Sequence, residues 1–117
     1  MIWIISGTQD GREIGAALAD REQSKPEGER REILMTVVSQ YGKVLAAHKG
    51  LDIEVGRFRE EDMLRVIAEK GISLILDASH PYAAIVSETA RAACTKAGID
   101  YVRYERAEIP LLSLIHK

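Results

Sequence analysis

Apolar residues gather in five short runs along this chain, and each run predicts a β-strand. Short apolar runs bounded by polar or glycine-containing segments are typical of strands that are buried on both faces of a parallel sheet. Their spacing leaves room for a helix between most neighbouring runs, which favours an α/β fold. The runs are Ile2–Ile5, Ile33–Val38, Leu51–Val55, Ser73–Leu76 and Tyr101–Tyr104.

The segments between these runs carry the period of a helix. Residues 60–70 show it best, because Met63, Leu64 and Ile67 form one apolar stripe and acidic residues fill the first turn. Gly98 is a typical residue just beyond a helix end. The charged stretch Glu22–Glu32 predicts a solvated, mobile loop instead. The predicted helices are Asp10–Arg21, a short helical turn at Val44–His48, Glu60–Lys70 and Pro81–Ala97.

This alternation of strands and helices predicts a Rossmann-like α/β fold. We expect a doubly wound parallel sheet of about five strands in three α/β/α layers. Right-handed crossovers and a 3-2-1-4-5 strand order would place the first and fourth strands side by side. Ligands of open α/β sheets bind beyond the carboxyl ends of the strands, where the strand order reverses. The segments after the first and fourth strands are therefore expected to flank one crevice.

The composition is that of one globular domain. The chain has 117 residues, 46% of them hydrophobic, and a formal net charge of −2. The nearly balanced charge argues against a nucleic-acid partner, and the apolar Ile2–Ile5 is too short for a signal or membrane-spanning segment. The single cysteine, Cys94, excludes an internal disulfide and is expected to be a small core residue; no metal site is predicted. We expect a cytoplasmic protein.

A glycine-containing turn joins the first strand to the first helix. Gly7 suits a tight turn, and Gly11 and Gly15 would let the helix approach its neighbours closely. Backbone N–H groups at a helix start can hold a phosphate, assisted here by hydroxyl side chains. The turn therefore supplies candidate cofactor ligands, although such turns also occur with a purely structural role. The candidates are Ser6, Gly7, Thr8, Asp10, Gly11 and Arg12.

The residues after the second strand bear on the choice of dinucleotide. A domain that binds NAD usually has an acidic residue there, which hydrogen-bonds the 2′-hydroxyl of the ribose. This chain instead offers Ser39, Tyr41, Gly42 and Lys43 as candidate cofactor ligands. The missing acid and the nearby lysine favour a 2′-phosphate and therefore NADP. The alternative is that Lys43 is an ordinary surface lysine.

A carboxylate and a Ser-His-Pro turn follow the fourth run, where a ligand is expected. Asp77 and His80 are the candidate catalytic residues, and Ser79 is a candidate cofactor ligand. His80 and Tyr82 are candidate substrate ligands. The segment also has structural alternatives. Asp77 would only hold a loop, Pro81 would only begin a helix at its favoured first position, and His80, which precedes that proline, would have a structural role.

Four motifs in this chain resemble, in the same order, those of the precorrin-6A reductase family of corrin-ring biosynthesis. The third motif, similar to Asp-Ala-Thr-His-Pro-Phe-Ala of the family, is the most specific. The resemblance extends over nearly the whole chain, from Ile2 to about Arg106. The motifs are Gly7-Thr8-x-Asp10-Gly11-Arg12, Val55-Gly56-Arg57, Asp77-Ala78-Ser79-His80-Pro81-Tyr82-Ala83 and Tyr101-Val102-Arg103-Tyr104-Glu105-Arg106.

The resemblance implies NADPH-dependent reduction of one double bond in a tetrapyrrole acid, precorrin-6A or its cobalt form, in cobalamin biosynthesis. NADPH would supply the hydride, and His80 would lie near the nicotinamide or a substrate carboxylate. The alternatives are a truncated nucleotide-binding module without activity and another NADP-dependent oxidoreductase. A short-chain-dehydrogenase-like enzyme is disfavoured, because neither Tyr82 nor Tyr101 has a lysine four residues later.

The expected domain organisation follows from the same resemblance. Residues 1–106 would form a Rossmann-like NADP-binding domain, and residues 107–117 an apolar tail. Family members usually continue into a second α/β domain that closes over the macrocycle. The tail, with its apolar Ile109–Ile115, would be a hinge toward such a domain, absent from this chain, or a surface for self-association. The family's usual Arg-Pro is replaced here by Arg106-Ala107.

Overall fold

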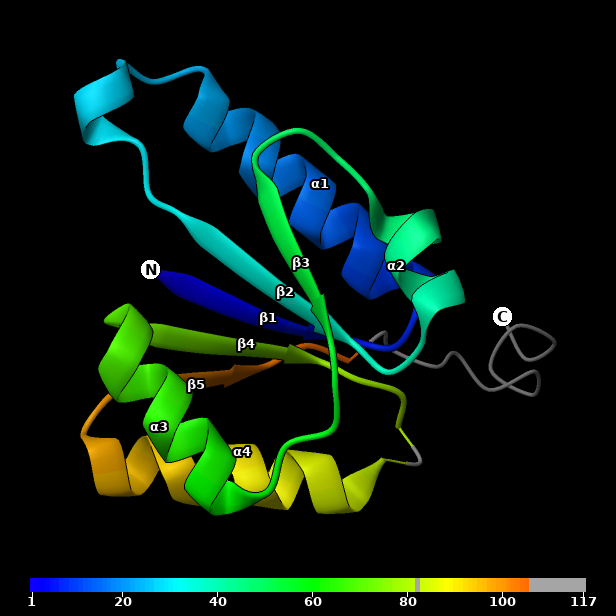
Figure 1. The fold of residues 1–117 in the computed structure, drawn as a ribbon, viewed down its shortest axis with the longest axis vertical. Helices are drawn as coiled ribbons and strands as arrows, with labels where there is room; N and C mark the ends of the chain where they lie inside the picture. Colours follow the sequence, from blue (N-terminus) through cyan, green and yellow to red (C-terminus); the bar gives the residue numbers. More distant parts are fainter. Residues whose placement is uncertain (82, 106–117) are drawn as a thin grey trace, which may run out of the picture.

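A computed structural model describes residues 1–81 and 83–105. The five strands of this part of the chain form a single sheet (Figure 1). All neighbouring strands are parallel, and they lie in the order β3-β2-β1-β4-β5. The predicted α/β class and strand order are therefore confirmed. The strands are β1 (Ile2–Ser6), β2 (Ile33–Val37), β3 (Leu51–Val55), β4 (Leu74–Ala78) and β5 (Asp100–Arg103).

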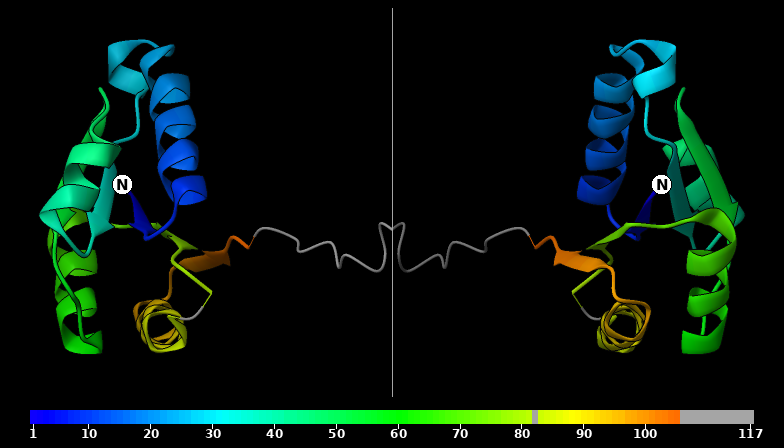
Figure 2. Two further views of the ribbon diagram at one scale, coloured as in Figure 1. Left: turned by 90° about the vertical axis from the view of Figure 1, so that its right-hand side faces the viewer. Right: turned by 90° about the vertical axis from the view of Figure 1, so that its left-hand side faces the viewer.

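Helices cover both faces of the sheet and produce the predicted three layers (Figure 2). On one face lie α1 (Gln9–Gln23) and α2 (Gln40–Ala46), and on the other lie α3 (Glu60–Lys70) and α4 (Ala84–Ala97). A short 3₁₀ helix, η1 (Glu27–Glu29), precedes β2. The chain runs from β1 outward to β3 and then crosses back past β1 to β4. Connections between parallel strands are generally right-handed, so this reversal puts α1 and α2 on one face and α3 and α4 on the other.

The central strand, β1, contributes side chains to both cores. Trp3 and Ile5 belong to the core under α3 and α4, whereas Ile4 belongs to the core under α1 and α2. The indole N–H of the fully buried Trp3 donates a hydrogen bond to Oγ1 of Thr36 at 2.9 Å. Its ring meets Phe58 edge to face, with ring centroids 5.4 Å apart. Burial on both faces explains why this run of the sequence is continuously apolar.

The register between β1 and β4 brings the ends of these two strands together. Ile2 pairs with Leu74, and Ser6, the last residue of β1, pairs with Ala78, the last residue of β4. The chain therefore leaves the sheet from two neighbouring strands at the same edge. This is the adjacency that the sequence predicts for the reversal point of the strand order.

The start of α2 differs from the prediction. The sequence predicts a helical turn at Val44–His48, but α2 begins at Gln40 and ends at Ala46. Ser39 caps this helix, because its Oγ accepts a hydrogen bond from the backbone N of Gly42 at 3.0 Å. The segment that the sequence presents as a loop after β2 is therefore helical.

The start of α4 also differs from the prediction. The helix begins at Ala84 instead of Pro81, because the backbone N of Ala83 donates to the carbonyl of His80 at 2.8 Å and closes a separate turn. Pro81 therefore precedes the helix and does not occupy its first turn. The predicted helix end is confirmed, since Gly98 has φ of 70° and follows Ala97, the last helical residue.

The charged stretch after α1 is less solvated than the sequence suggests. Glu22 is buried, and its carboxylate accepts hydrogen bonds from Nζ of Lys25 at 2.8 Å and from the backbone N of Arg31 at 2.7 Å. These hydrogen bonds hold the pKa of Glu22 below its usual value. The prediction of a solvated, mobile loop is therefore wrong for Glu22, which joins the end of α1 to the chain that enters β2.

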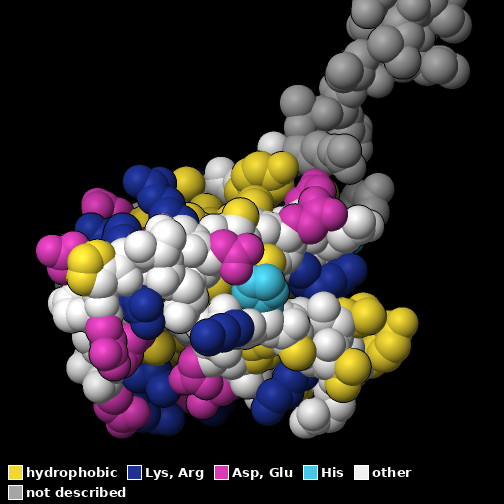
Figure 3. Space-filling model, turned by 90° about the horizontal axis from the view of Figure 1, so that it is seen from above, with side chains coloured by type: hydrophobic (Ala, Val, Ile, Leu, Met, Phe, Trp, Pro, Cys, Tyr) yellow, Lys and Arg dark blue, Asp and Glu magenta, His cyan; other side chains and the backbone are white. Residues whose placement is uncertain are grey.

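Charged side chains of both signs are interspersed on the face shown in Figure 3. The side chains of His48 and Asp20 meet with 2.8 Å between Nε2 and Oδ1. Within residues 1–81 and 83–105, no helix has the length and apolar character needed to cross a membrane. Cys94 is buried in the core, as predicted. The predicted tail at 107–117 lies outside the described residues.

Candidate functional site

The β1–α1 turn and the segment after β4 meet at the carboxyl edge of the sheet. A Cβ atom added to Gly7 would lie 3.4 Å from the backbone N of His80 and 3.7 Å from Cα of Ser79. Thr8 ties the two segments together, because its Oγ1 donates a hydrogen bond to the carbonyl of Ala78 at 3.2 Å. The predicted meeting of the two turns is therefore confirmed.

Gly11 allows α1 to begin close against the sheet, as predicted. A Cβ atom there would lie 2.8 Å from Oγ of Ser6 and 3.1 Å from Cβ of Ala78, so a larger residue must displace its neighbours. Thr8 caps the helix by accepting a hydrogen bond from the backbone N of Gly11 at 3.0 Å. Gly7 has no positive φ, so no tight left-handed turn requires it. Its lack of a side chain instead leaves the exposed backbone accessible.

A pocket of about 230 Å³ opens beside this turn, and we call it the polar pocket because Arg12, Ser39 and Tyr41 line it. Its walls come from the end of β1, the first turns of α1, and the chain from the end of β2 into α2. It brings together candidate cofactor ligands that are far apart in the sequence. The pocket is lined by Ser6, Gly7, Arg12, Val37, Val38, Ser39, Tyr41, Gly42 and Leu45.

The remaining candidate cofactor ligands do not line the polar pocket. Lys43 is exposed on α2, and the basic residue in the lining is Arg12 of α1. Asp10 lies half-buried in the first turn of α1, and Ser79 is buried just beyond β4. Arg12, also a candidate ligand from the sequence, is thus the basic residue of the polar pocket, and the assignment of Lys43 as a cofactor ligand stays a prediction. The residues outside the lining are Thr8, Asp10, Gly11, Lys43 and Ser79.

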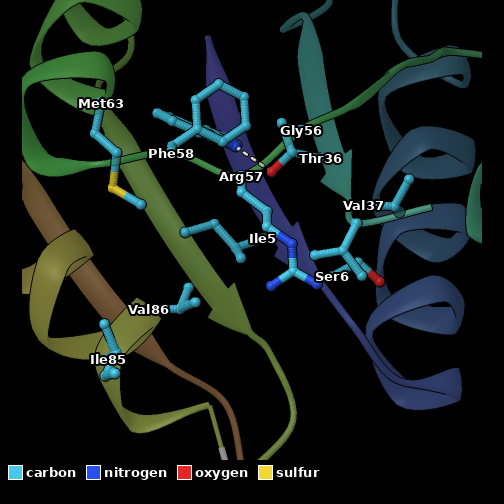
Figure 4. Close-up of a pocket in the computed structure, with 12 residues that line it drawn as sticks. Ile5, Ser6, Thr36, Val37, Gly56, Arg57, Phe58, Met63, Ile85 and Val86 are labelled. Carbon is cyan, nitrogen blue, oxygen red and sulfur yellow. Dashed lines mark hydrogen bonds between the residues drawn. The ribbon is translucent and has the colours of Figure 1, made fainter.

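An apolar pocket of about 220 Å³ lies next to the polar pocket (Figure 4). The two pockets share Ser6, Val37 and Val38 as a common wall. Among the described residues that line the apolar pocket, Arg57 from the chain between β3 and α3 is the basic one, and its motif is the signal that the sequence offers. The apolar pocket is lined by Trp3, Ile5, Ser6, Thr36, Val37, Val38, Gly56, Arg57, Phe58, Met63, Ile85 and Val86.

Asp77 lies within β4 and is fully buried. Its Oδ1 accepts hydrogen bonds from the backbone N of Ser79 at 3.0 Å and from Nη1 of Arg103 at 3.1 Å. Its Oδ2 accepts from the hydroxyls of Ser87 and Tyr101, both at 2.6 Å. Burial alone would raise the pKa of Asp77, but the hydrogen bonds from Ser79, Ser87 and Tyr101 outweigh burial and lower it. The carboxylate is thus buried and hydrogen-bonded within the protein, whereas the sequence predicts that it lies at the end of the strand, where a ligand could reach it.

Arg103 of β5 extends this network to the segment that follows β4. Its Nη1 donates to the carbonyl of Ser79 at 2.9 Å and to Oγ of Ser79 at 3.3 Å, while Nη2 lies 3.4 Å from a carboxylate oxygen of Glu105. Ser79 is therefore held by both its backbone and its side chain, and the next residue, His80, is exposed. Tyr82, the other candidate substrate ligand, lies outside the described residues.

Comparison with known proteins identifies the family. The family model described as Precorrin-6x reductase CbiJ/CobK matches residues 1–116 of this chain. The chain belongs to this family. The cobalt-precorrin-6A reductase of Priestia megaterium is 35% identical over 107 residues, which cover 92% of this chain and 39% of that protein. The cobalt-precorrin-6A reductase of Synechocystis sp. is 30% identical over 111 residues, which cover 94% and 40%.

A solved structure supports the same fold. The structure described as CobK precorrin-6A reductase superposes with a TM-score of 0.71 and 24% sequence identity, and the match covers 93% of this chain and 40% of that one. The chain thus spans about 40% of the length of the relatives that it matches. The resemblance to the precorrin-6A reductase family that the four motifs indicate is confirmed.

Proposed function

We propose that this chain is the NADPH-binding part of a precorrin-6A reductase, with residues 1–106 as the nucleotide-binding domain. The observation that carries the proposal is the polar pocket, where residues from the β1–α1 turn and from the start of α2 gather beside the β1–β4 crevice. When bound, NADPH supplies the hydride that reduces one double bond of precorrin-6A or of its cobalt form.

The residues of the polar pocket fit the 2′-phosphorylated ribose of NADPH. Arg12 offers a permanent positive charge and several N–H donors, which suit a phosphate. Ser39 and Tyr41 add hydroxyl groups; Oγ of Ser39 accepts from the N of Gly42 and keeps its own proton to donate. The described residues that line the pocket include no acidic residue. The exposed backbone of Gly7 lets a phosphate approach the start of α1.

We assign His80 to the substrate side of the crevice. It is exposed beside Gly7, and the buried Asp77 fixes the backbone of the preceding residue, Ser79. An imidazole in this position can donate a hydrogen bond to a carboxylate of the tetrapyrrole. We retain Tyr82 as a second substrate ligand. Asp77 is assigned as a positioning residue for His80, because its burial keeps it from touching a ligand.

We expect this chain to bind NADPH but to turn over little tetrapyrrole by itself. The polar and apolar pockets have volumes of about 230 and 220 Å³, which are too small to enclose a macrocycle. Pockets for drug-sized ligands measure roughly 300–1,000 Å³. The substrate therefore needs a further wall, and the relatives are long enough to supply one. An anaerobic assay of NADPH oxidation with precorrin-6A measures this; turnover comparable to that of a full-length relative would contradict the expectation.

Calorimetric titration of the chain with NADPH and with NADH tests the proposed cofactor. NADPH should bind more tightly, because only NADPH carries the 2′-phosphate. Arg12→Ala should weaken NADPH binding by about tenfold or more, the scale of a charge-assisted hydrogen bond, and should change NADH binding little. Lys43→Ala is the matched control, since it removes an exposed cation that does not line the pocket. Equal affinity of the wild-type chain for both nucleotides would refute the preference for NADPH.

A further inference from the structure

A third pocket, of about 310 Å³, lies between α4 and β5, on the side of β4 that is remote from the polar pocket. Helix α4 runs beside β5, the strand at this end of the described sheet (Figure 2). We call this space the α4–β5 pocket. Pro81 is among its lining residues and directly follows His80, so the pocket adjoins the segment to which we assign the substrate. The pocket has no role in the function proposed so far.

One face of α4 forms the helical side of the α4–β5 pocket. Its members recur at the spacing of three or four residues that places side chains on one face of a helix, and they are Ala84, Ser87, Glu88 and Arg91. Ala90 points elsewhere, because it belongs to the buried core. At 1.5 Å per residue, the helix from Ala84 to Arg91 is roughly 10 Å long. This length accommodates a side chain of a ligand but not a macrocycle.

Arg91 brings a positive charge to the pocket that no described carboxylate neutralises. Its guanidinium carbon lies 5.4 Å from the centroid of the Tyr101 ring, and this stacking orients the exposed group. Among the described residues, none forms an ion pair with Arg91, not even Glu88 on the same helix face. A guanidinium group that is oriented in this way offers paired N–H donors to a carboxylate of a ligand.

The other arginine of the pocket, Arg103, is already engaged within the protein. Its Nη1 donates to Oδ1 of Asp77 at 3.1 Å and to the carbonyl of Ser79 at 2.9 Å, and its Nη2 lies 3.4 Å from a carboxylate oxygen of Glu105. Two carboxylates therefore neutralise Arg103, which forms a fixed wall of the pocket. An anion that enters the pocket is attracted mainly by Arg91.

We propose that the α4–β5 pocket receives a carboxylate side chain of the tetrapyrrole and that Arg91 binds this carboxylate. The inference rests on the proposed function, because it concerns the same substrate. It makes Arg91 a substrate ligand separate from His80, and one that favours a macrocycle with an acidic side chain at this position.

The position of the pocket favours the substrate over the cofactor as its occupant. The polar pocket, which we assign to the 2′-phosphate, is built from β1, β2, α1 and α2, whereas the α4–β5 pocket lies beyond β4. Pro81 connects the α4–β5 pocket directly to His80 on the substrate side of the crevice. A macrocycle beside His80 can therefore extend one side chain toward Arg91 while its rings stay outside the pocket.

Anaerobic titration of the chain with precorrin-6A in the presence of NADP⁺ tests this inference. NADP⁺ has no hydride to transfer, so the tetrapyrrole stays unreduced and its visible absorption reports binding. Arg91→Ala should weaken the binding of precorrin-6A by about tenfold and leave the affinity for NADP⁺ unchanged. Arg91→Lys should recover part of this loss, because it keeps the charge but not the paired donors.

Two further variants show whether charge at the α4–β5 pocket controls binding. Glu88→Gln should strengthen the binding of precorrin-6A by about two- to threefold, because it removes a negative charge from the lining. Arg65→Ala is the matched control, since Arg65 is an exposed helical arginine that lines neither this pocket nor the polar and apolar pockets. The control should bind precorrin-6A like the wild-type chain.

A spectroscopic signal locates the contact. The Nε–H signal of Arg91 in a ¹H–¹⁵N spectrum is identified by its loss in Arg91→Ala, and precorrin-6A should shift it in the wild-type chain. If NADP⁺ binds but this signal does not move, or Arg91→Ala keeps wild-type affinity for precorrin-6A, the inference is overturned and the proposed cofactor remains. Absence of any precorrin-6A binding to the wild-type chain would overturn it equally. If the wild-type chain binds neither NADP⁺ nor NADPH, the proposed function itself is refuted.

Discussion

Replacement of Asp77 should destabilise the domain more than any change on its surface. Asp77→Ala removes the common acceptor of four hydrogen bonds that reach the carboxylate from the backbone of Ser79, from α4 through Ser87, and from β5 through Tyr101 and Arg103. Three parts of the fold therefore lose one shared anchor. The guanidinium group of Arg103 also loses its buried counter-charge.

The expected loss can be estimated from the burial of the ion pair. Removing one member of a buried ion pair typically costs about 3–5 kcal/mol. The Asp77 side chain is 0% exposed and that of Arg103 is 18% exposed, and Arg103 keeps its hydrogen bond to the carbonyl of Ser79 at 2.9 Å. We therefore expect the lower part of that range, about 3 kcal/mol, for Asp77→Ala. Asp77→Asn keeps one acceptor oxygen and should cost about 1–2 kcal/mol.

The effect of Asp77→Asn should depend on pH with a defined sign. The pKa of Asp77 is lower in the folded chain than its usual value, so the ionised carboxylate stabilises the fold. This stabilisation is fully present above the unfolded pKa of about 3.9 and is lost as the pH falls through the folded pKa. The difference in unfolding free energy between the wild-type chain and Asp77→Asn should therefore be constant near neutral pH and shrink below about pH 4.

Urea denaturation followed by far-ultraviolet circular dichroism, at about pH 7 and at about pH 3, measures both quantities. Asp52→Asn is the matched control, because Asp52 is an exposed aspartate on β3. The control should change the unfolding free energy by less than about 0.5 kcal/mol. A loss for Asp77→Ala of under about 1 kcal/mol, or a difference for Asp77→Asn that does not change with pH, would show that the network does not anchor the fold.

Two further predictions concern the packing of α1 and of the core. Gly11→Ala should lower the thermal unfolding midpoint, at a cost of about 1–3 kcal/mol, because its Cβ would lie 2.8 Å from Oγ of Ser6; Gly7→Ala, with a nearest contact of 3.4 Å, should stay close to wild type. Cys94 should react with a thiol reagent in urea but hardly in the native chain, since burial and the nearby Asp100 raise its pKa to about 11; comparable labelling rates would contradict its burial.

The strands and their order could be predicted because both depend on local patterns. A run such as Ile2–Ile5 is apolar throughout because cores cover it on both sides, and handedness then restricts the strand order. The residue at which a helix starts is harder to predict, because it depends on which of several alternative hydrogen bonds the backbone forms there. Proline is generally favoured in the first turn of a helix. Here, however, the carbonyl of His80 accepts a hydrogen bond from the backbone N of Ala83, and α4 begins only at Ala84. Ser39 caps the start of α2, but from the sequence alone a capping serine cannot be told from a serine in a loop.

The polar pocket could be predicted in outline, with Arg12 among its candidate ligands, but the orientation of Lys43 could not be predicted. The face of α2 that packs on the sheet contains Gly42 and the buried Ala46, which turns Lys43 toward solvent. This orientation depends on tertiary packing that the sequence does not specify locally. The sequence singles out Asp77, but it does not reveal the hydrogen-bond network around the buried carboxylate, because one donor, Tyr101, lies far along the chain.

The apolar pocket was missed for a different reason. Its residues come singly or in pairs from β1, β2, the β3–α3 connection, α3 and α4, and most of them have the character of ordinary core positions. No periodicity distinguishes a side chain that fills a core from one that lines an opening at its edge. Only Arg57, in a short motif beside Gly56, marks the place in the sequence.

The central place of β1 has a consequence for the order of events during synthesis. Ile2 pairs with Ile33 on one side and with Leu74 on the other, so the second pairing must wait until most of the chain has been made. At about 5–20 residues per second, β1 presents an unpaired apolar edge for several seconds, which is a hazard for association with other chains. The hydrogen bond from Thr8 to Ala78 forms only when β4 docks. The crevice is therefore completed late in folding, and a ligand bound there can stabilise the finished sheet but cannot guide its first pairings.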